Sequence, residues 1–195
     1  MKRKIVLLVV LWVAPAFSQP LSQGERDFAL SALHASRKMF LDAISGLSEP
    51  QWKYKPSPDR WSVAECAEHI IASEDFLYEM ITEKVMKGPA ASPAKPPTRE
   101  QDEAVLTMVT DRSKKFNAPE PLRPSGRWAS PEDAVRAFKE RRDRTISSIR
   151  ETEADLRGHA QSSRDAYQWF LFLSGHSERH TAQINEVKAD PGYPK

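Results

Sequence analysis

The chain has 195 residues, of which 39% are hydrophobic and 29% charged, with a formal net charge of +2. This length is typical of one domain, and the apolar content excludes an intrinsically disordered chain. Cys66 is the only cysteine, which excludes an internal disulfide, so the fold must be held by packing, alone or with a metal.

Residues 1–18 have the pattern of a signal peptide. Three basic residues precede an uninterrupted apolar run, 5–13, which is too short to cross a bilayer as a stable helix. Ala16 and Ser18 are small residues at the positions expected for cleavage after Ser18. The alternative is an uncleaved N-terminal anchor. Cleavage would leave no stable membrane anchor, and it predicts a periplasmic or secreted protein.

The predicted leader also accounts for the apparent basicity of the chain. It contains three of the 29 basic residues and none of the 27 acidic ones, so 26 basic and 27 acidic residues remain after cleavage. A protein that binds nucleic acid through its phosphates needs an excess of basic side chains. The sequence therefore predicts no nucleic-acid partner.

Beyond the leader we expect one helical domain spanning 24–190, with four long amphipathic helices at 24–47, 63–87, 131–156 and 164–189. The starts of these helices have recognisable cap signals. Ser62 and Glu65 form a capping-box pattern, and Ser130 stands directly before Pro131 and two acidic residues. Ser163 is the expected cap of the last helix.

Proline-rich connections separate the predicted helices, at 48–61, 88–97 and 117–128. A short extra helix is predicted within 100–116, and the charged run 141–144 is expected to face solvent. No segment alternates with the period of two that is typical of strands. The predicted fold is therefore all-α, an up-down four-helix bundle with long Pro-rich connections and a short extra helix.

Three histidines are expected to point toward the core of this bundle. His176 and His180 are four residues apart in the last helix, so they lie one above the other on the same, largely apolar face. His69 lies within the apolar arc of the second long helix. Packing of the two helices can bring all three imidazoles together.

Such a group has two interpretations. Three neutral imidazoles suit a divalent metal, Zn²⁺, Ni²⁺ or Fe²⁺, and three protein ligands with an open position are typical of a catalytic site. The alternative is a hydrogen-bonded core cluster without a metal, in which each buried histidine needs its own partners. His34 and His159 are expected at the surface, outside this group.

Two segments resemble the signature of the DinB-like (damage-inducible) superfamily: 60–70, RWSVAECAEHI, and 176–184, HSERHTAQI. The resemblance implies a four-helix bundle with a divalent metal on His69, His176 and His180. Related proteins include bacillithiol transferases and a mycothiol-dependent maleylpyruvate isomerase, which implies a small-molecule substrate. The leader of this chain argues against thiol transfer, because such thiols are kept in the cytoplasm.

The sequence leaves several roles open. The reaction could be hydrolysis or transfer to a small molecule, or the bundle could be non-catalytic with a structural His cluster. Cys66, one turn before His69, could be a fourth ligand, a nucleophile or a small core residue. Arg179 could orient an anionic substrate, and two copies of the chain could pair through a helix face.

Overall fold

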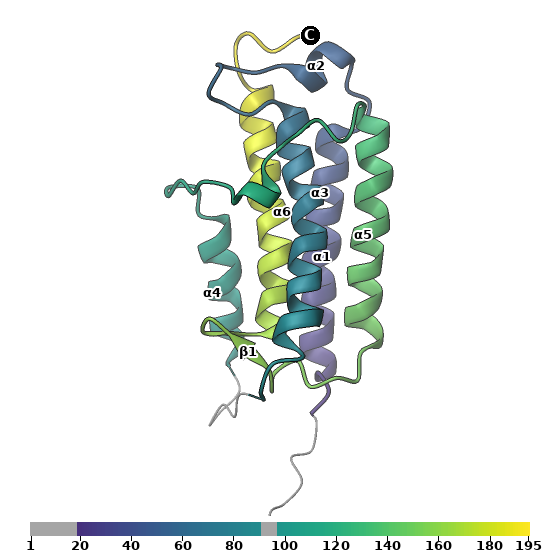
Figure 1. The fold of residues 1–195 in the computed structure, drawn as a ribbon, viewed down its shortest axis with the longest axis vertical. Coiled ribbons are helices and arrows are strands. Elements are labelled where there is room, and N and C mark those ends of the chain that lie inside the picture. Colours follow the sequence, from purple (N-terminus) through teal and green to yellow (C-terminus); the bar gives the residue numbers. More distant parts are fainter. Residues whose placement is uncertain (1–18, 91–96) are drawn as a thin grey trace, which may run out of the picture.

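The computed structural model describes residues 19–90 and 97–195, so the predicted leader lies outside the described residues. Four long helices lie side by side along the long axis of the molecule (Figure 1): α1 Gln23–Ile44, α3 Val63–Glu79, α5 Pro131–Glu151 and α6 Ala166–Lys188. The predicted all-α four-helix bundle is confirmed. Among the described residues, no helix combines the length and the apolar character needed to cross a membrane.

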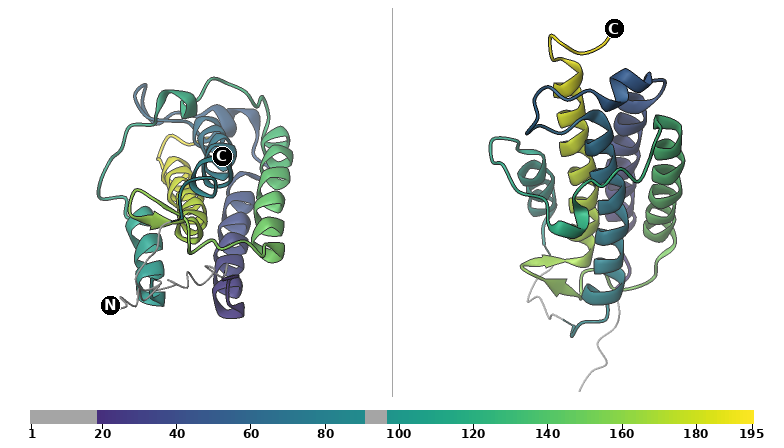
Figure 2. Two further views of the ribbon diagram at one scale, coloured as in Figure 1. Left: turned by 60° about the horizontal axis from the view of Figure 1, so that its bottom comes forward. Right: turned by 45° about the horizontal axis from the view of Figure 1, so that its top comes forward.

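The helix directions differ from a simple alternation along the chain. α1 and α6 run one way, whereas α3 and α5 both run the other way (Figure 1). The chain makes this return through α4, Arg99–Thr110, and a 3₁₀ turn at Glu120–Leu122. Figure 2 shows α4 outside the four long helices, packed beside α6. α4 is shorter than the predicted 100–116 because Asp111 ends it with an extended backbone.

Small elements close the two ends of the bundle. α2, Glu49–Lys53, lies over one end, and a hairpin of β1 Ala160–Gln161 and β2 Arg164–Asp165 lies at the other (Figure 1). The prediction of a helix-free loop over 48–61 was therefore wrong. Ser48 and Gln51 form a capping box there, and a proline is tolerated in the first turn of a helix.

The predicted cap of the last helix was also wrong. Asp165 caps α6, with its side chain accepting a hydrogen bond from the backbone N–H of Gln168 at 2.7 Å. Ser163 has a φ of 65° and lies in the hairpin turn, where a left-handed backbone is required. At its far end α3 continues as a π-helix, Met80–Val85, so the predicted 63–87 helix changes its hydrogen-bond pattern near residue 80.

The core consists of two apolar clusters at opposite ends of the bundle. The first includes side chains from the start of α1 and the end of α5, and the second includes side chains from the end of α1 and the start of α5. A polar layer separates them, with at least one residue from each long helix: Ser36, Glu74, Arg142, Ser174 and Ser177. Hydrogen bonds within this layer require particular turns of the four helices to lie side by side, so they set the relative positions of the helices along the bundle axis.

Arg142 is the centre of this polar layer and is fully buried, at 0% exposure. Its guanidinium donates to both carboxylate oxygens of Glu74, at 2.6 and 3.0 Å, and to the hydroxyl oxygens of Ser36 at 2.6 Å and Ser177 at 2.8 Å. It also donates to the carbonyl of Leu33 at 2.8 Å. The expectation that 141–144 forms a solvated face was wrong for this residue, because α1, α3 and α6 all supply partners for it.

Candidate metal centre

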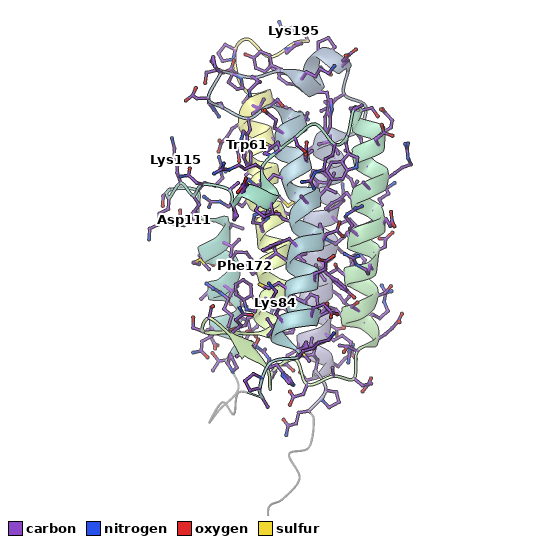
Figure 3. The ribbon with its side chains drawn as sticks, in the orientation of Figure 1. Trp61, Lys84, Asp111, Lys115, Phe172 and Lys195 are labelled. Carbon is purple, nitrogen blue, oxygen red and sulfur yellow. The ribbon has the colours of Figure 1, made fainter. Side chains whose placement is uncertain are left out.

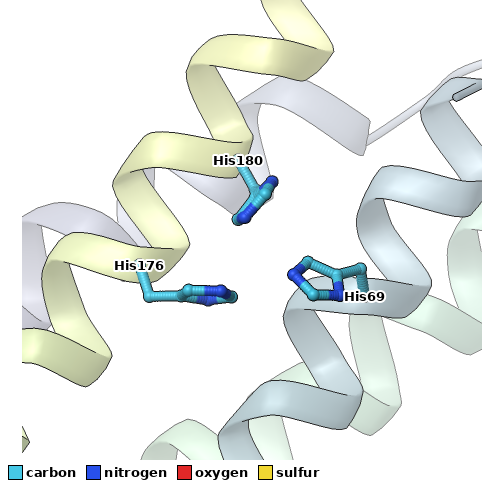
Figure 4. Close-up of side chains that lie close together, drawn as sticks. All are labelled: His69, His176 and His180. Atoms are coloured by element: carbon cyan, nitrogen blue, oxygen red, sulfur yellow. The ribbon is translucent and has the colours of Figure 1, made fainter. Parts of the chain in front are cut away.

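α3 and α6 bring His69, His176 and His180 together, a group called the His triad below (Figure 4). One imidazole nitrogen from each residue lies within 4.8 Å of those of the other two. The ring centroids are 4.4 Å apart for His69 and His180, 5.0 Å for His69 and His176, and 4.6 Å for the pair on α6. The three residues predicted from sequence therefore converge.

Hydrogen bonds fix two of the three rings through Nδ1. Nδ1 of His69 is 2.8 Å from the carbonyl oxygen of Leu122, and Nδ1 of His180 is 2.9 Å from Oε1 of Gln183. Because both partners are acceptors, each Nδ1 carries the hydrogen and donates it. This tautomer leaves Nε2 of each ring with a free lone pair, which is the arrangement found around metal-ligating histidines.

Burial keeps these imidazoles neutral. It lowers the pKa of His69, although the hydrogen bond to Leu122 acts in the opposite direction. It lowers the pKa of His180 to about 3 and that of His176 well below its ordinary value, and the neighbouring imidazoles add to both shifts. Neutral imidazole is the form that binds a metal, so the group is already in its ligating form at neutral pH.

These shifts predict that the metal-free protein loses stability as the pH falls below about 6.5. The unfolded chain protonates His180 near pH 6.5, whereas the folded chain does so near 3, so unfolding is coupled to proton uptake between these values. At pH 5 this histidine alone should lower the free energy of unfolding by about 2 kcal/mol. Urea denaturation at pH 7 and pH 5 measures the change.

The matched comparison for this pH dependence is His180→Gln, with His34→Gln as the control, because His34 is an exposed histidine on α1. The loss of stability between pH 7 and pH 5 should be smaller in His180→Gln than in the wild type. The control should lose as much as the wild type. An equal loss in all three proteins would contradict the prediction.

The His triad is next to the solvent and is bordered by aromatic rings. His69 is 3% exposed, whereas His176 and His180 are half-buried. The ring centroids of Trp61 and His69 are 5.0 Å apart. The Phe172 ring stacks on the His176 ring, with a centroid distance of 6.2 Å. Figure 3 shows both aromatic residues on the side of the bundle where α4 lies. Two of the three residues of the triad are therefore partly exposed, and aromatic rings lie beside them.

Other residues considered from the sequence lie outside the group. Cys66 is fully buried in the second apolar cluster, burial raises the pKa of its thiol, and its sulfur is not among the converging ligand atoms. These observations favour a core role for Cys66. His34 is exposed, as expected. His159 is half-buried rather than exposed, since its Nδ1 is 3.2 Å from the carbonyl of Gly88.

Arg179 does not face a substrate site as its position beside His180 had suggested. Its guanidinium donates to the backbone carbonyls of Val109 at 3.2 Å, Asp111, and Lys114 at 2.5 Å. Glu68 is a further buried residue beside the triad, and it was not predicted as a site residue from the sequence. Both residues hold the connection between α4 and α5. Most of their partners are backbone groups, although Glu68 also accepts from the Ser125 hydroxyl and pairs with the Arg127 guanidinium at 3.4 Å, so no local side-chain motif indicated these roles.

The donor set fits a divalent metal. Three neutral imidazoles, two of them fixed by hydrogen bonds at Nδ1, can direct their remaining nitrogens to one point without further change in protonation. Among the described residues no carboxylate or thiol joins this group. A metal held here would keep at least one coordination position free of protein ligands.

Comparison with known proteins agrees with this architecture. The sequence profile of the DinB superfamily matches residues 32–184, which include the whole His triad. The uncharacterized protein YuaE of Bacillus subtilis (strain 168) is 26% identical over 164 residues, which cover 82% of this chain and 96% of that protein. No solved structure matches the chain. With a match over most of its length, the chain belongs to the DinB superfamily.

Proposed function

We propose that this chain is an exported metal-dependent enzyme that binds Zn²⁺, Ni²⁺ or Fe²⁺ through Nε2 of the His triad. The proposed reaction is hydrolysis or group transfer on a small molecule. The observation that carries the proposal is the convergence of three neutral imidazole nitrogens within 4.8 Å, next to solvent. Imidazole ligands suit these three metals, whereas Mg²⁺ and Ca²⁺ prefer oxygen ligands.

The residues around the triad have separate roles in this proposal. Leu122 and Gln183 keep Nδ1 of two ligands protonated and so orient the rings. Trp61 and Phe172 provide flat apolar surfaces beside the ligands, which favour a substrate with an apolar or aromatic part and limit the access of water. When bound, the metal would supply Lewis acidity at its open coordination position.

The partial exposure of His176 and His180 favours an enzyme over a purely structural cluster. A structural metal site is closed, with protein ligands at every position, whereas this group has three donors and contact with solvent. The proposed export favours hydrolysis over thiol transfer, because it takes the chain away from the cytoplasmic thiols. The proposal of export rests on the signal-peptide pattern of residues 1–18.

The test begins with the secreted or periplasmic fraction of cells that express the full chain. N-terminal sequencing should find a mature protein that begins at Gln19, and elemental analysis should find about one divalent metal per chain. The metal-loaded and metal-free proteins are then compared on a panel of aromatic esters, amides and thiol acceptors. Absence of stoichiometric metal, even after reconstitution with Zn²⁺, Ni²⁺ and Fe²⁺, would overturn the proposal.

A further inference from the structure

A buried carboxylate lies directly beside His69 on α3. Glu68 is 5% exposed and accepts four hydrogen bonds from one short loop. The donors are the backbone N–H groups of Ser125 at 2.8 Å, Gly126 at 2.7 Å and Arg127 at 3.1 Å, together with Oγ of Ser125 at 3.0 Å. Gly126 has a φ of 84°, a conformation that glycine adopts without strain, and its N–H makes the shortest of these bonds.

The same loop also contacts the His triad. It begins with the 3₁₀ turn that ends at Leu122, and the Leu122 carbonyl accepts the hydrogen bond from Nδ1 of His69 at 2.8 Å. α3 therefore holds this loop at two points through adjacent residues. Glu68 binds its backbone N–H groups, and His69 binds one of its carbonyls.

The other end of the connection between α4 and α5 is held in a complementary way. Arg179, directly before His180, donates to three backbone carbonyls in 109–114. Glu68, beside His69, and Arg179, beside His180, thus hold the two ends of the connection between α4 and α5. The hydrogen-bond acceptors of the Arg179 guanidinium lie within 109–114, and its carbon atom Cζ lies 5.4 Å from the centroid of the Phe116 ring, so Arg179 makes no hydrogen bond to Leu122.

We propose that Glu68 is a positioning residue for the metal site. By fixing 125–127, its carboxylate holds the Leu122 carbonyl against Nδ1 of His69 and so directs Nε2 of that ring toward the metal position. The inference rests on the metal site proposed above. Hydrogen-bond partners of a ligand's second nitrogen commonly change metal affinity by roughly 10- to 100-fold when they are lost.

If Glu68 served only to pack against the loop, a buried carboxylate would be less favourable than an apolar side chain. Taking a charged group out of water is unfavourable unless hydrogen bonds replace its hydration, and an apolar side chain would avoid that cost. Four directed donors offset the cost here, and they fix the loop's orientation as well as its distance. Because binding linkage is reciprocal, metal binding should stabilise the loop to the same extent as the loop increases metal affinity.

The experiment uses the full mature chain with Zn²⁺ as the probe. Zinc affinity is measured by chelator competition for the wild type, Glu68→Gln, Ser125→Ala and the control Asp75→Asn. Asp75 is a carboxylate on the same helix, but it binds Arg141 and Arg144 of α5 instead of the loop. Amide hydrogen exchange over 120–127 is followed in each protein with and without zinc, and circular dichroism checks the fold.

We expect Glu68→Gln to weaken zinc binding by about 10-fold or more. Ser125→Ala removes a single donor, so it should have a smaller effect in the same direction while keeping the carboxylate buried and bonded. Asp75→Asn should bind zinc within about 2-fold of the wild type. Zinc should slow exchange over 120–127 in the wild type and much less in Glu68→Gln.

Equal zinc affinity in the wild type and Glu68→Gln would overturn the positioning role and leave the metal site intact. The same conclusion would follow if zinc bound the wild type without changing exchange over 120–127. A wild type that binds no zinc would instead overturn the metal site itself, and this inference with it. If Glu68→Gln does not fold, Ser125→Ala gives the decisive comparison.

Discussion

Replacement of His176 by alanine should abolish stoichiometric metal binding while leaving the helical bundle folded. The variant removes one of three nitrogen donors, so zinc affinity should fall by more than the roughly 10- to 100-fold typical of changes behind the ligands. The backbone of α6 is held by the two apolar clusters and the polar layer on other faces of the helix. Elemental analysis measures the metal, and far-UV circular dichroism measures the helix content.

The control for this variant is His34→Ala, which removes an exposed histidine from α1. It should retain the metal content and helicity of the wild type. Two results would contradict the proposal. Full metal content in His176→Ala would show that the ion binds elsewhere, and complete unfolding would show that the cluster holds the fold together.

Arg142→Met should be strongly destabilising. It leaves the carboxylate of Glu74, which is 1% exposed, in the core without its cationic partner. Breaking one side of a buried ion pair typically costs about 3–5 kcal/mol, because the remaining charge cannot regain its hydration. Arg144→Met is the matched control, since Arg144 lies on the same helix but pairs with Asp75 near solvent, and such a pair contributes about 0–1 kcal/mol. Urea denaturation of the metal-free proteins measures both.

A double variant separates the effect of the unpaired charge from the effect of lost packing. In Arg142→Met/Glu74→Met both charges are gone, so most of the stability lost in Arg142→Met should return. Equal stability losses in Arg142→Met and Arg144→Met would show that the buried pair contributes no more than a surface pair. A double variant no more stable than Arg142→Met would show that packing, and not the unpaired carboxylate, accounts for the loss.

Local patterns predicted much of this fold. The caps at Ser62 and Ser130 depend on residues within one turn, and both are present in the structure. The inward direction of His69, His176 and His180 follows from apolar periodicity within single helices. Packing α3 against α6 was then sufficient to bring the three imidazoles together.

The parts that sequence did not reveal depend on distant partners. Arg142 is one of three arginines in the charged segment 141–144, and they look alike in sequence. Among them only Arg142 has Glu74, 68 residues earlier, as a fully buried partner. Glu68 binds backbone N–H groups more than 50 residues away, and backbone donors are the same in every sequence. The helix cap is Asp165 and not the predicted Ser163, because residues 160–165 form a hairpin of two residue pairs before α6 begins. Strands this short give no periodic pattern in the sequence.

The division of the His triad between two antiparallel helices has a consequence for the packing of the molecule. His176 and His180 belong to one helix, so their spacing survives any movement of α6 as a rigid rod. His69 reaches them only if α3 keeps its axial position and its rotation about its own axis relative to α6. A change of one residue in the packing of α3 would move the contacting side chain by about 1.5 Å along the helix axis and by about 100° around it. The affinity of the site for a metal ion would therefore depend on the position of α3 along α6. A drop in metal affinity would report a shift of α3 even where the helix content stays unchanged.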